Sequence, residues 1–205
     1  MSRKHIVALM LSFVYLAVVG FTDIPVNPFS VQYVELPLTP LPDKPKQQTP
    51  KFFNMSLFVE QDQAIAAITK KYKRVSYDTA VKLVYTVYEE SFKQQVDPKL
   101  ILALIATESA FNQNAISSEG AKGFMQVIPK WHQDKIKGRN IFNMHVNIEV
   151  GIEIYKECAS RNKSNYSTLA CYNGATTYER AIVFKQAVER HRQYFIAAIP
   201  SSNWG

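Results

Sequence analysis

The sequence predicts one mainly α-helical domain, and three observations support this prediction. Apolar residues recur at intervals of three and four along several segments after residue 56, which is the spacing of one helix face. Cap residues precede these segments, and Asp97 followed by Pro98 is the strongest such pair. The chain has 205 residues and is 47% hydrophobic, which suits one core plus appendages and excludes a disordered chain.

Residues 1–22 are predicted to be an export signal or a membrane anchor. A nearly unbroken apolar run, Ile6 to Phe21, follows Arg3 and Lys4, which is the order found in export segments. The run is just shorter than the ~17 residues that a membrane-spanning helix needs at least. Cleavage and retention as an anchor therefore both stay open.

Residues 23–55 are predicted to form a proline-rich linker. Prolines at positions 25, 28, 37, 40, 42, 45 and 50 remove backbone donors and keep the chain extended. A short strap packed over the domain is the alternative, because Phe29, Tyr33 and Leu36 are apolar. The predicted folded domain accordingly comprises residues 56–200.

Two helices are predicted at the start of this domain. The first covers residues 57–72, and Ser76 caps a stronger second one. An apolar stripe on the second helix should pack against the helix that follows Asp97. This stripe comprises Ala80, Val81, Val84, Val87, Tyr88 and Phe92.

The helix after Asp97 carries a charge where its apolar face should continue. Its stripe consists of Leu100, Ile101, Leu104 and Ile105. The next position on the same face is Glu108. Because burial disfavours the ionised form of a carboxyl and raises its pKa, a buried Glu108 would donate a proton at neutral pH. The alternative is that Glu108 ends its helix in solvent, as most glutamates do.

A shaped loop is predicted after Glu108. Gly120 and Gly123 allow backbone conformations that other residues resist, and polar residues before them hold turns. These polar residues are Asn112, Asn114, Ser117 and Ser118. The loop leads to Gln126, whose amide both donates and accepts hydrogen bonds. Beyond it, Trp131 and His132 precede Lys135, Lys137 and Arg139, and we interpret this stretch as surface rather than as the lining of a groove.

Three further helices are predicted. One begins near Asn147, with Gly151 permitting close packing and with two buried rows. The rows are Ile148, Ile152 and Tyr155, and Val150, Ile154 and Cys158. Ser167 is expected to cap a short helix that Gly174 ends, which leaves Tyr172 and Asn173 at its tip. Thr176 and Glu179 form a capping box for a last helix to about Phe195.

Five ordered blocks between roughly residues 75 and 175 resemble the catalytic domain of the lytic transglycosylases, a family that cleaves peptidoglycan. The blocks are Glu108-Ser109; Ser117 with Gly120-Ala121; Gly123-Phe124-Met125-Gln126; Asn147-Ile148 with Gly151 and Tyr155; and Cys171-Tyr172-Asn173-Gly174. Several blocks in order are more specific than any single one. The chain departs from the family pattern at Gln113, Phe124, Asn143-Met144 and Cys171, and no departure removes the acid or the amide.

This resemblance implies a lysozyme-like fold of packed helices with a long active-site loop. It also implies that Glu108 protonates the oxygen between MurNAc and GlcNAc and then deprotonates the C6 hydroxyl, which closes a 1,6-anhydro ring. By the same resemblance, Ser117, Gln126, Tyr172 and Asn173 would hold the sugar, and Met125 would line the cleft. The implied partner is the peptidoglycan glycan strand, at the periplasmic face of the cell envelope, and a secretion, conjugation or phage assembly would suit such an enzyme.

Three other functions stay open. A lysozyme-type hydrolase would use the same fold and glutamate with a second carboxylate, and Glu119, the nearest other acid, is interpreted as a solvated loop residue. A module that binds the cell wall without cutting it is the second alternative. The net charge of +7 allows a nucleic-acid-binding protein, but the lysines and arginines are scattered apart from residues 70–74, and the export segment disfavours this function.

Cys158 and Cys171 are the only cysteines, and an exported protein meets an oxidising compartment. A disulfide and two separate buried cysteines explain the sequence equally well. No cofactor is expected, and the histidines at positions 5, 132, 145 and 191 form no metal-ligand motif.

Overall fold

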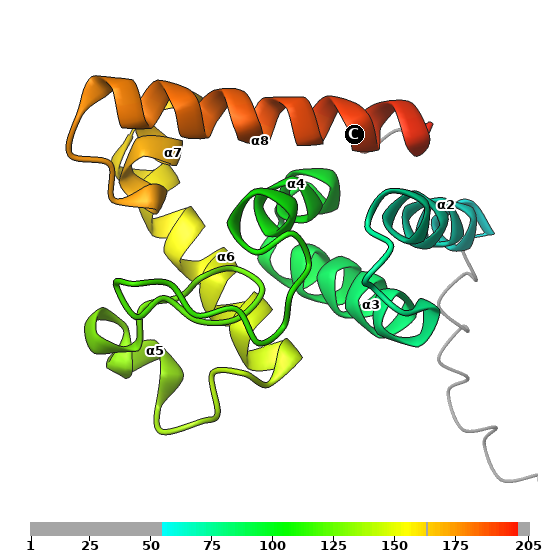
Figure 1. The fold of residues 1–205 in the computed structure, drawn as a ribbon, viewed down its shortest axis with the longest axis horizontal. Helices are drawn as coiled ribbons and strands as arrows, with labels where there is room; N and C mark the ends of the chain where they lie inside the picture. Colours follow the sequence, from blue (N-terminus) through cyan, green and yellow to red (C-terminus); the bar gives the residue numbers. More distant parts are fainter. Residues whose placement is uncertain (1–54, 163, 201–205) are drawn as a thin grey trace, which may run out of the picture. The chain divides into compact units, whose positions relative to one another are not determined.

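The computed structural model describes residues 55–162 and 164–200, and these residues are mainly helical, as the sequence predicts (Figure 1). The helices are α2 (Met55–Lys71), α3 (Tyr77–Gln94), α4 (Pro98–Glu108), the 3₁₀ turn η1 (Pro129–Trp131), α5 (Gln133–Ile136), α6 (Met144–Arg161), α7 (Asn165–Asn173) and α8 (Tyr178–Ala198). Residues 1–22 and all but the last residue of the predicted linker lie outside this description. Among the described helices, none has the length and apolarity to cross a membrane.

The helix caps confirm three predictions and correct three. Asp97 caps α4, Ser76 caps α3 by accepting a hydrogen bond from the Thr79 amide, and the left-handed Gly174 ends α7. The helix expected from about Asn147 begins a turn earlier, because Asn143 caps α6.

The predicted cap residues of the last two helices are both wrong: that of α7 lies too late in the sequence, and that of α8 lies too early. Ser164, not Ser167, caps α7, and its hydroxyl accepts from the Ser167 amide. Thr177, not Thr176, caps α8. In both places the neighbouring hydroxyl residues have the same capping chemistry, so composition alone does not choose between them.

The main core forms around α4, whose residues from Pro98 to Ala106 are all buried. The last helix, α8, packs along α4 and also reaches α2, and α3 packs against α4 as predicted (Figure 1). The buried residues of α8 include Phe184, Val188 and Phe195. One predicted core residue is wrong: Phe92 on α3 is 47% exposed, because it lies on the same helix face as the exposed Tyr85 and Glu89.

A second, smaller apolar cluster lies on the other side of α6. Ile148 and Ile152 face the main core, whereas Val146, Val150 and Ile154 pack with Val127, Ile136 and Ile141 from the segment between α4 and α6. The two predicted rows on α6 therefore serve two cores. As a result, α6 fixes the long loop to the helical body.

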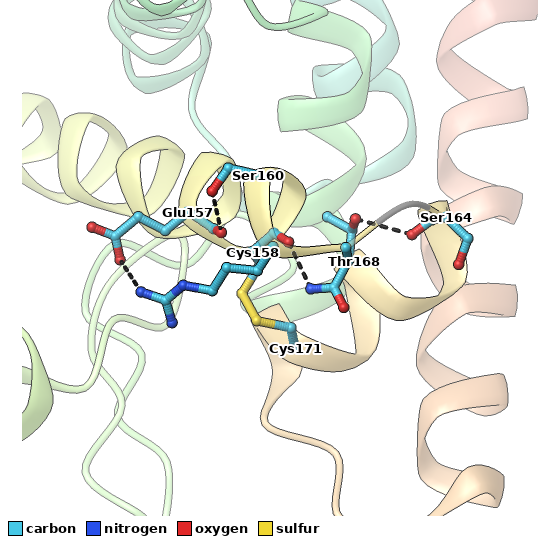
Figure 2. Close-up of a disulfide and its surroundings, with 8 residues drawn as sticks. Glu157, Cys158, Ser160, Ser164, Thr168 and Cys171 are labelled. Carbon is cyan, nitrogen blue, oxygen red and sulfur yellow. Dashed lines mark hydrogen bonds and ion pairs between the residues drawn. A yellow bond between two sulfur atoms is a disulfide. The ribbon is translucent and has the colours of Figure 1, made fainter.

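A disulfide joins Cys158 on α6 to Cys171 on α7, with their Cα atoms 5.6 Å apart (Figure 2). From the sequence, a disulfide and two separate cysteines were equally good explanations, and the structure contains the disulfide. Cys158 is buried, while Cys171 is exposed one residue before Tyr172. The bridge thus ties the tip of α7 to the helix that supports the loop.

We predict that the double variant Cys158→Ala/Cys171→Ala has a lower free energy of unfolding than the oxidised protein, by up to about 3 kcal/mol. The reason is that the bridge closes a short loop, with a separation of 13 residues, and so restricts the unfolded chain. Urea unfolding with and without reductant measures the difference. Reductant should destabilise the parent and leave the variant unchanged; a parent that is insensitive to reductant would contradict the prediction.

Candidate active site

Glu108 is the last residue of α4, at the point where the buried helix reaches a cavity of about 450 Å³. Asp97 caps the start of α4 by accepting from the Lys99 amide, and its carboxylate also pairs with Arg192 on α8 at 3.1 Å. The helix is therefore anchored at its far end. Its rigid packing places the Glu108 side chain in the cavity wall.

The chain reverses direction directly after Glu108. Ala110 and Phe111 both have positive φ angles, 46° and 63°, a conformation that costs about 1–2 kcal/mol for each residue with a side chain. Burial of Phe111 offsets this cost, since its ring packs edge-on against Tyr72 and Phe195 at centroid distances of 4.6 and 6.2 Å. The buried ring thus fixes a strained turn that keeps the following loop beside the carboxyl.

The loop is held by its own backbone hydrogen bonds. The Ser117 amide donates to the Ala121 carbonyl, and the Ser117 hydroxyl accepts from the Ala121 amide at 3.1 Å. Gly120 turns the chain between them with a φ of 81°. Lys122 and Val127 exchange backbone hydrogen bonds in an isolated antiparallel bridge. These contacts make the loop a fixed wall of the cavity.

Asn147 on α6 connects the loop to the helical body. Its Oδ1 accepts from the Met125 amide at 2.8 Å, and its Nδ2 donates to the carbonyls of Lys122 and Ile141 at 2.9 and 3.0 Å. Asn147 is 1% exposed, and its hydrogen bonds to the Met125 amide and the Ile141 carbonyl are buried. A side chain at Gly123 would clash with this amide, which explains why glycine stands there.

Gly151, one turn further along α6, lets Met125 pack against the helix. A Cβ atom at this position would lie 2.5 Å from the Met125 sulfur. The resemblance to the family includes this glycine, and the structure gives its physical reason. Met125 is consequently buried and held at both its backbone and its side chain.

Tyr172 closes the cavity from α7. Its hydroxyl donates to the Met125 carbonyl at 2.9 Å, and its ring lies edge-on to Tyr155. Burial raises the pKa of Tyr172 well above its usual value, and the charge of a nearby Glu108 carboxylate raises it further. The hydroxyl is therefore neutral and close to the acid.

Gln126 is fixed with its amide nitrogen bound to the loop. Nε2 donates to the carbonyls of Gly123 and Ala115 at 2.9 and 3.3 Å, and the backbone has a φ of 49°. Both N–H groups are used, so the amide oxygen is the part of this side chain that is left for a ligand.

Burial raises the pKa of the Glu108 carboxyl to about 8. The ordinary pKa of 4.5 is that of a carboxyl in water, and the apolar cavity wall cannot solvate the charge of the Glu108 carboxylate as water does. At neutral pH most Glu108 side chains are therefore protonated. A neutral carboxyl in a cavity that a fixed amide and a tyrosine also line can act as a proton donor.

All six site residues predicted from the sequence line this one cavity. They are Glu108, Ser117, Met125, Gln126, Tyr172 and Asn173. They come from α4, the loop and α7, and only the fold brings them together. In the part of the chain that the structure describes, no group of three or more His, Cys, Asp and Glu side chains is placed to hold a metal ion.

The cavity also contains residues that sequence reasoning placed elsewhere. Trp131 and His132, interpreted as surface, line it, and so does the exposed Glu119. Glu157 and Arg161 reach it from the end of α6 and were not singled out at all. The one sequence signal for this end of the cavity is a tryptophan just after the proline that starts η1.

The chain is similar to known proteins in its family and in one relative. The model of the family described as "Transglycosylase SLT domain" matches residues 86–194. The chain is also similar to the membrane-bound lytic murein transglycosylase C of Mannheimia succiniciproducens, with 31% identity over 112 residues. That alignment covers 46% of this chain and 31% of the relative, so the chain spans about a third of the relative's length.

We predict that Asn147→Ala lowers the free energy of unfolding by about 2–4 kcal/mol, because a buried amide and two carbonyls lose their partner. Thermal and urea unfolding measure the loss. Asn147→Asp tests the cause, since it keeps the acceptor for the Met125 amide but loses both donors. It should be at least as destabilised as Asn147→Ala, because it also buries a charge. The exposed Asn165→Ala is the control and should unfold like the parent; equal stability of all three variants would contradict this role of Asn147.

Proposed function

Because this chain belongs to the transglycosylase SLT domain family, we propose that it is a peptidoglycan lytic transglycosylase that cleaves the β-1,4 bond between MurNAc and GlcNAc. The observation that carries this proposal is the position of Glu108 at the end of the buried helix α4 and in the cavity wall, where burial raises the pKa of its carboxyl to about 8. A carboxyl with this pKa holds its proton at neutral pH and can transfer it to a leaving oxygen. The surrounding cavity contains every residue that the sequence assigns to sugar binding.

In the first step, Glu108 donates its proton to the oxygen of the glycosidic bond, and the bond to the anomeric carbon of MurNAc breaks. The N-acetyl group of the sugar can stabilise the positive charge on that carbon. In the second step, the Glu108 carboxylate accepts the proton of the sugar's own C6 hydroxyl. The C6 oxygen then bonds to the anomeric carbon, which yields 1,6-anhydro-MurNAc and restores the acid.

The same burial serves both steps. It keeps Glu108 protonated before the reaction and makes its carboxylate a stronger base afterwards, since the charge is poorly solvated. An attack by a group within the sugar competes with water only if the sugar is held in position. We assign this positioning to Ser117, Gln126, Tyr172 and Asn173, with Met125 as the apolar floor.

The loop and Tyr172 supply fixed hydrogen-bonding groups for this purpose. The Gln126 amide oxygen can accept from the acetamido N–H, because its nitrogen is already bound to the loop. The Tyr172 hydroxyl donates to the Met125 carbonyl, so its oxygen can accept from a sugar hydroxyl. Acceptors held in place bind sugar donors without a loss of side-chain freedom.

A lysozyme-type hydrolase is the second candidate, and one observation favours it. Glu119 lines the cavity together with Glu108. A second carboxylate can activate water or act as a nucleophile in glycoside hydrolysis. Glu119 is exposed, however, and lies on the loop rather than on a helix, so we rank it below the single-glutamate mechanism.

The cell envelope is the proposed location. The relative from M. succiniciproducens is described as membrane-bound, and the peptidoglycan that this chain is proposed to cleave lies there.

The proposal is tested by mass spectrometry of the fragments that the full chain releases from purified peptidoglycan. We expect anhydro-MurNAc ends from the parent protein, with a rate reduced at least 100-fold by Glu108→Gln, which keeps the shape but cannot give up a proton. Glu119→Gln should leave both the rate and the product nearly unchanged.

Two other results would overturn the mechanism. Reducing ends that disappear in Glu119→Gln would identify a hydrolase. Binding to peptidoglycan without release of any fragment would identify a cell-wall-binding module. The Gln variants differ from the parent by one atom group each, so their unfolding curves serve as the control for folding.

A further inference from the structure

One end of the cavity has an exposed aromatic side chain that the proposed reaction does not use. Trp131 lines the cavity and is 65% exposed, among the most exposed of the large apolar residues in the described part of the chain. Exposure of an indole ring to water is unfavourable unless a ligand covers it. Its position on the cavity wall makes the ring accessible to a ligand in the cavity.

The backbone around Trp131 is held in place. Pro129 begins the 3₁₀ turn η1 and restricts its conformation, and the His132 amide donates to the Pro129 carbonyl. Lys135 on α5 pairs with Glu157 on α6 at 2.6 Å, and the lysine side chain is only 13% exposed. This ion pair joins α5, which follows the segment that carries Trp131, to the end of α6. The ring is therefore presented from a fixed wall.

Arg161 lies one helical turn beyond Glu157 and also lines the cavity. Its guanidinium is 3.9 Å from the Glu157 carboxylate, whereas Lys135 approaches that carboxylate to 2.6 Å (Figure 2 shows Glu157 beside the disulfide). Lys135 is the closer partner, and the arginine side chain is 72% exposed. The guanidinium can therefore bind a carboxylate from a ligand at little cost in lost contacts.

These two side chains match two features of a glycan strand. The C–H faces of pyranose rings are apolar and pack flat against an aromatic ring, as other apolar groups do. MurNAc, unlike GlcNAc, carries a lactyl group that ends in a carboxylate or in a peptide with carboxylates. A stacking ring and an exposed guanidinium that line one cavity are complementary to a muramyl unit.

We propose that Trp131 and Arg161 form an outer subsite that binds a muramyl residue of the strand, with its sugar ring on Trp131 and its carboxylate on Arg161. The subsite rests on the proposed function, because it is placed on the same strand that Glu108 would cleave. It gives the enzyme a preference for strands whose muramyl groups carry a negative charge. Neutral chitin-type oligosaccharides lack that charge and should bind less well.

Binding without cleavage tests the subsite directly. The sequence contains two tryptophans, so Trp204→Phe leaves Trp131 as the single indole reporter. In the full chain with Glu108→Gln, a muramyl-containing tetrasaccharide should shift and quench the Trp131 fluorescence. Arg161→Gln in this background should weaken binding about tenfold, the loss expected for one charged contact. An unchanged spectrum at saturation of an independent binding assay would overturn the role of Trp131.

Three ligands distinguish the source of the carboxylate. They are a glycan with its peptides, the same glycan stripped to the lactyl group, and chitotetraose. If Arg161→Gln weakens the first two alike, the lactyl carboxylate is the ligand; if it weakens only the first, the peptide is. Chitotetraose binding should not change. If Arg161→Gln changes none of the three affinities, Arg161 has no part in the subsite.

Turnover separates the subsite from the reaction itself. Trp131→Ala should raise KM about tenfold with a smaller change in kcat, and Trp131→Phe should restore most of the affinity, since it keeps an aromatic face. Tyr77→Ala and Arg180→Ala are matched controls, because both residues are exposed and lie outside the cavity lining. Normal cleavage with an unchanged KM in Trp131→Ala would overturn the subsite and leave the function standing. Binding that depends on Trp131 without any cleavage would support the subsite and overturn the proposed function.

Discussion

The structure depends on one constraint: a carboxyl must sit where apolar packing would otherwise continue. The helix α4 is buried along nearly its whole length, and its final residue is Glu108. A carboxyl there cannot be solvated as it is in water, and its pKa rises to about 8. The strained turn after it requires compensation, which the burial of Phe111 supplies. The acid and the loop that faces it are thus products of the same core.

The helix α6 connects that core to the loop and to α7, which form the other walls of the site. Asn147 holds the loop through three hydrogen bonds, Gly151 makes room for Met125, and Cys158 ties the tip of α7. The first two contacts fix the loop wall of the cavity, and the third fixes the wall that α7 forms. Because Tyr172 also binds the Met125 carbonyl, the walls are connected to each other and not only to α6. Such a site needs little ordering when a ligand binds.

Most of the fold and the centre of the site follow from the sequence, because they depend on local spacing. Helical periodicity places Glu108 on a buried face, and the family resemblance supplies Gln126 and Tyr172. The predicted caps are shifted where nearby hydroxyl residues compete, as at Thr176 and Thr177. The outer end was missed for a different reason: Trp131 and Arg161 lie on separate elements, η1 and α6, and only the fold brings both to one cavity. Exposed residues have no periodic signal that would reveal such a pairing.

The most direct test of this account is the titration of Glu108 itself. Carboxyl infrared difference spectra, or carbon NMR of labelled glutamate, can be recorded against pH with Glu108→Gln as the reference that removes one signal. The account predicts one carboxyl that loses its proton near pH 8 and is absent from the variant. A Glu108 signal that titrates near 4.5, the ordinary value, would contradict the central claim that burial makes this residue a proton donor at neutral pH.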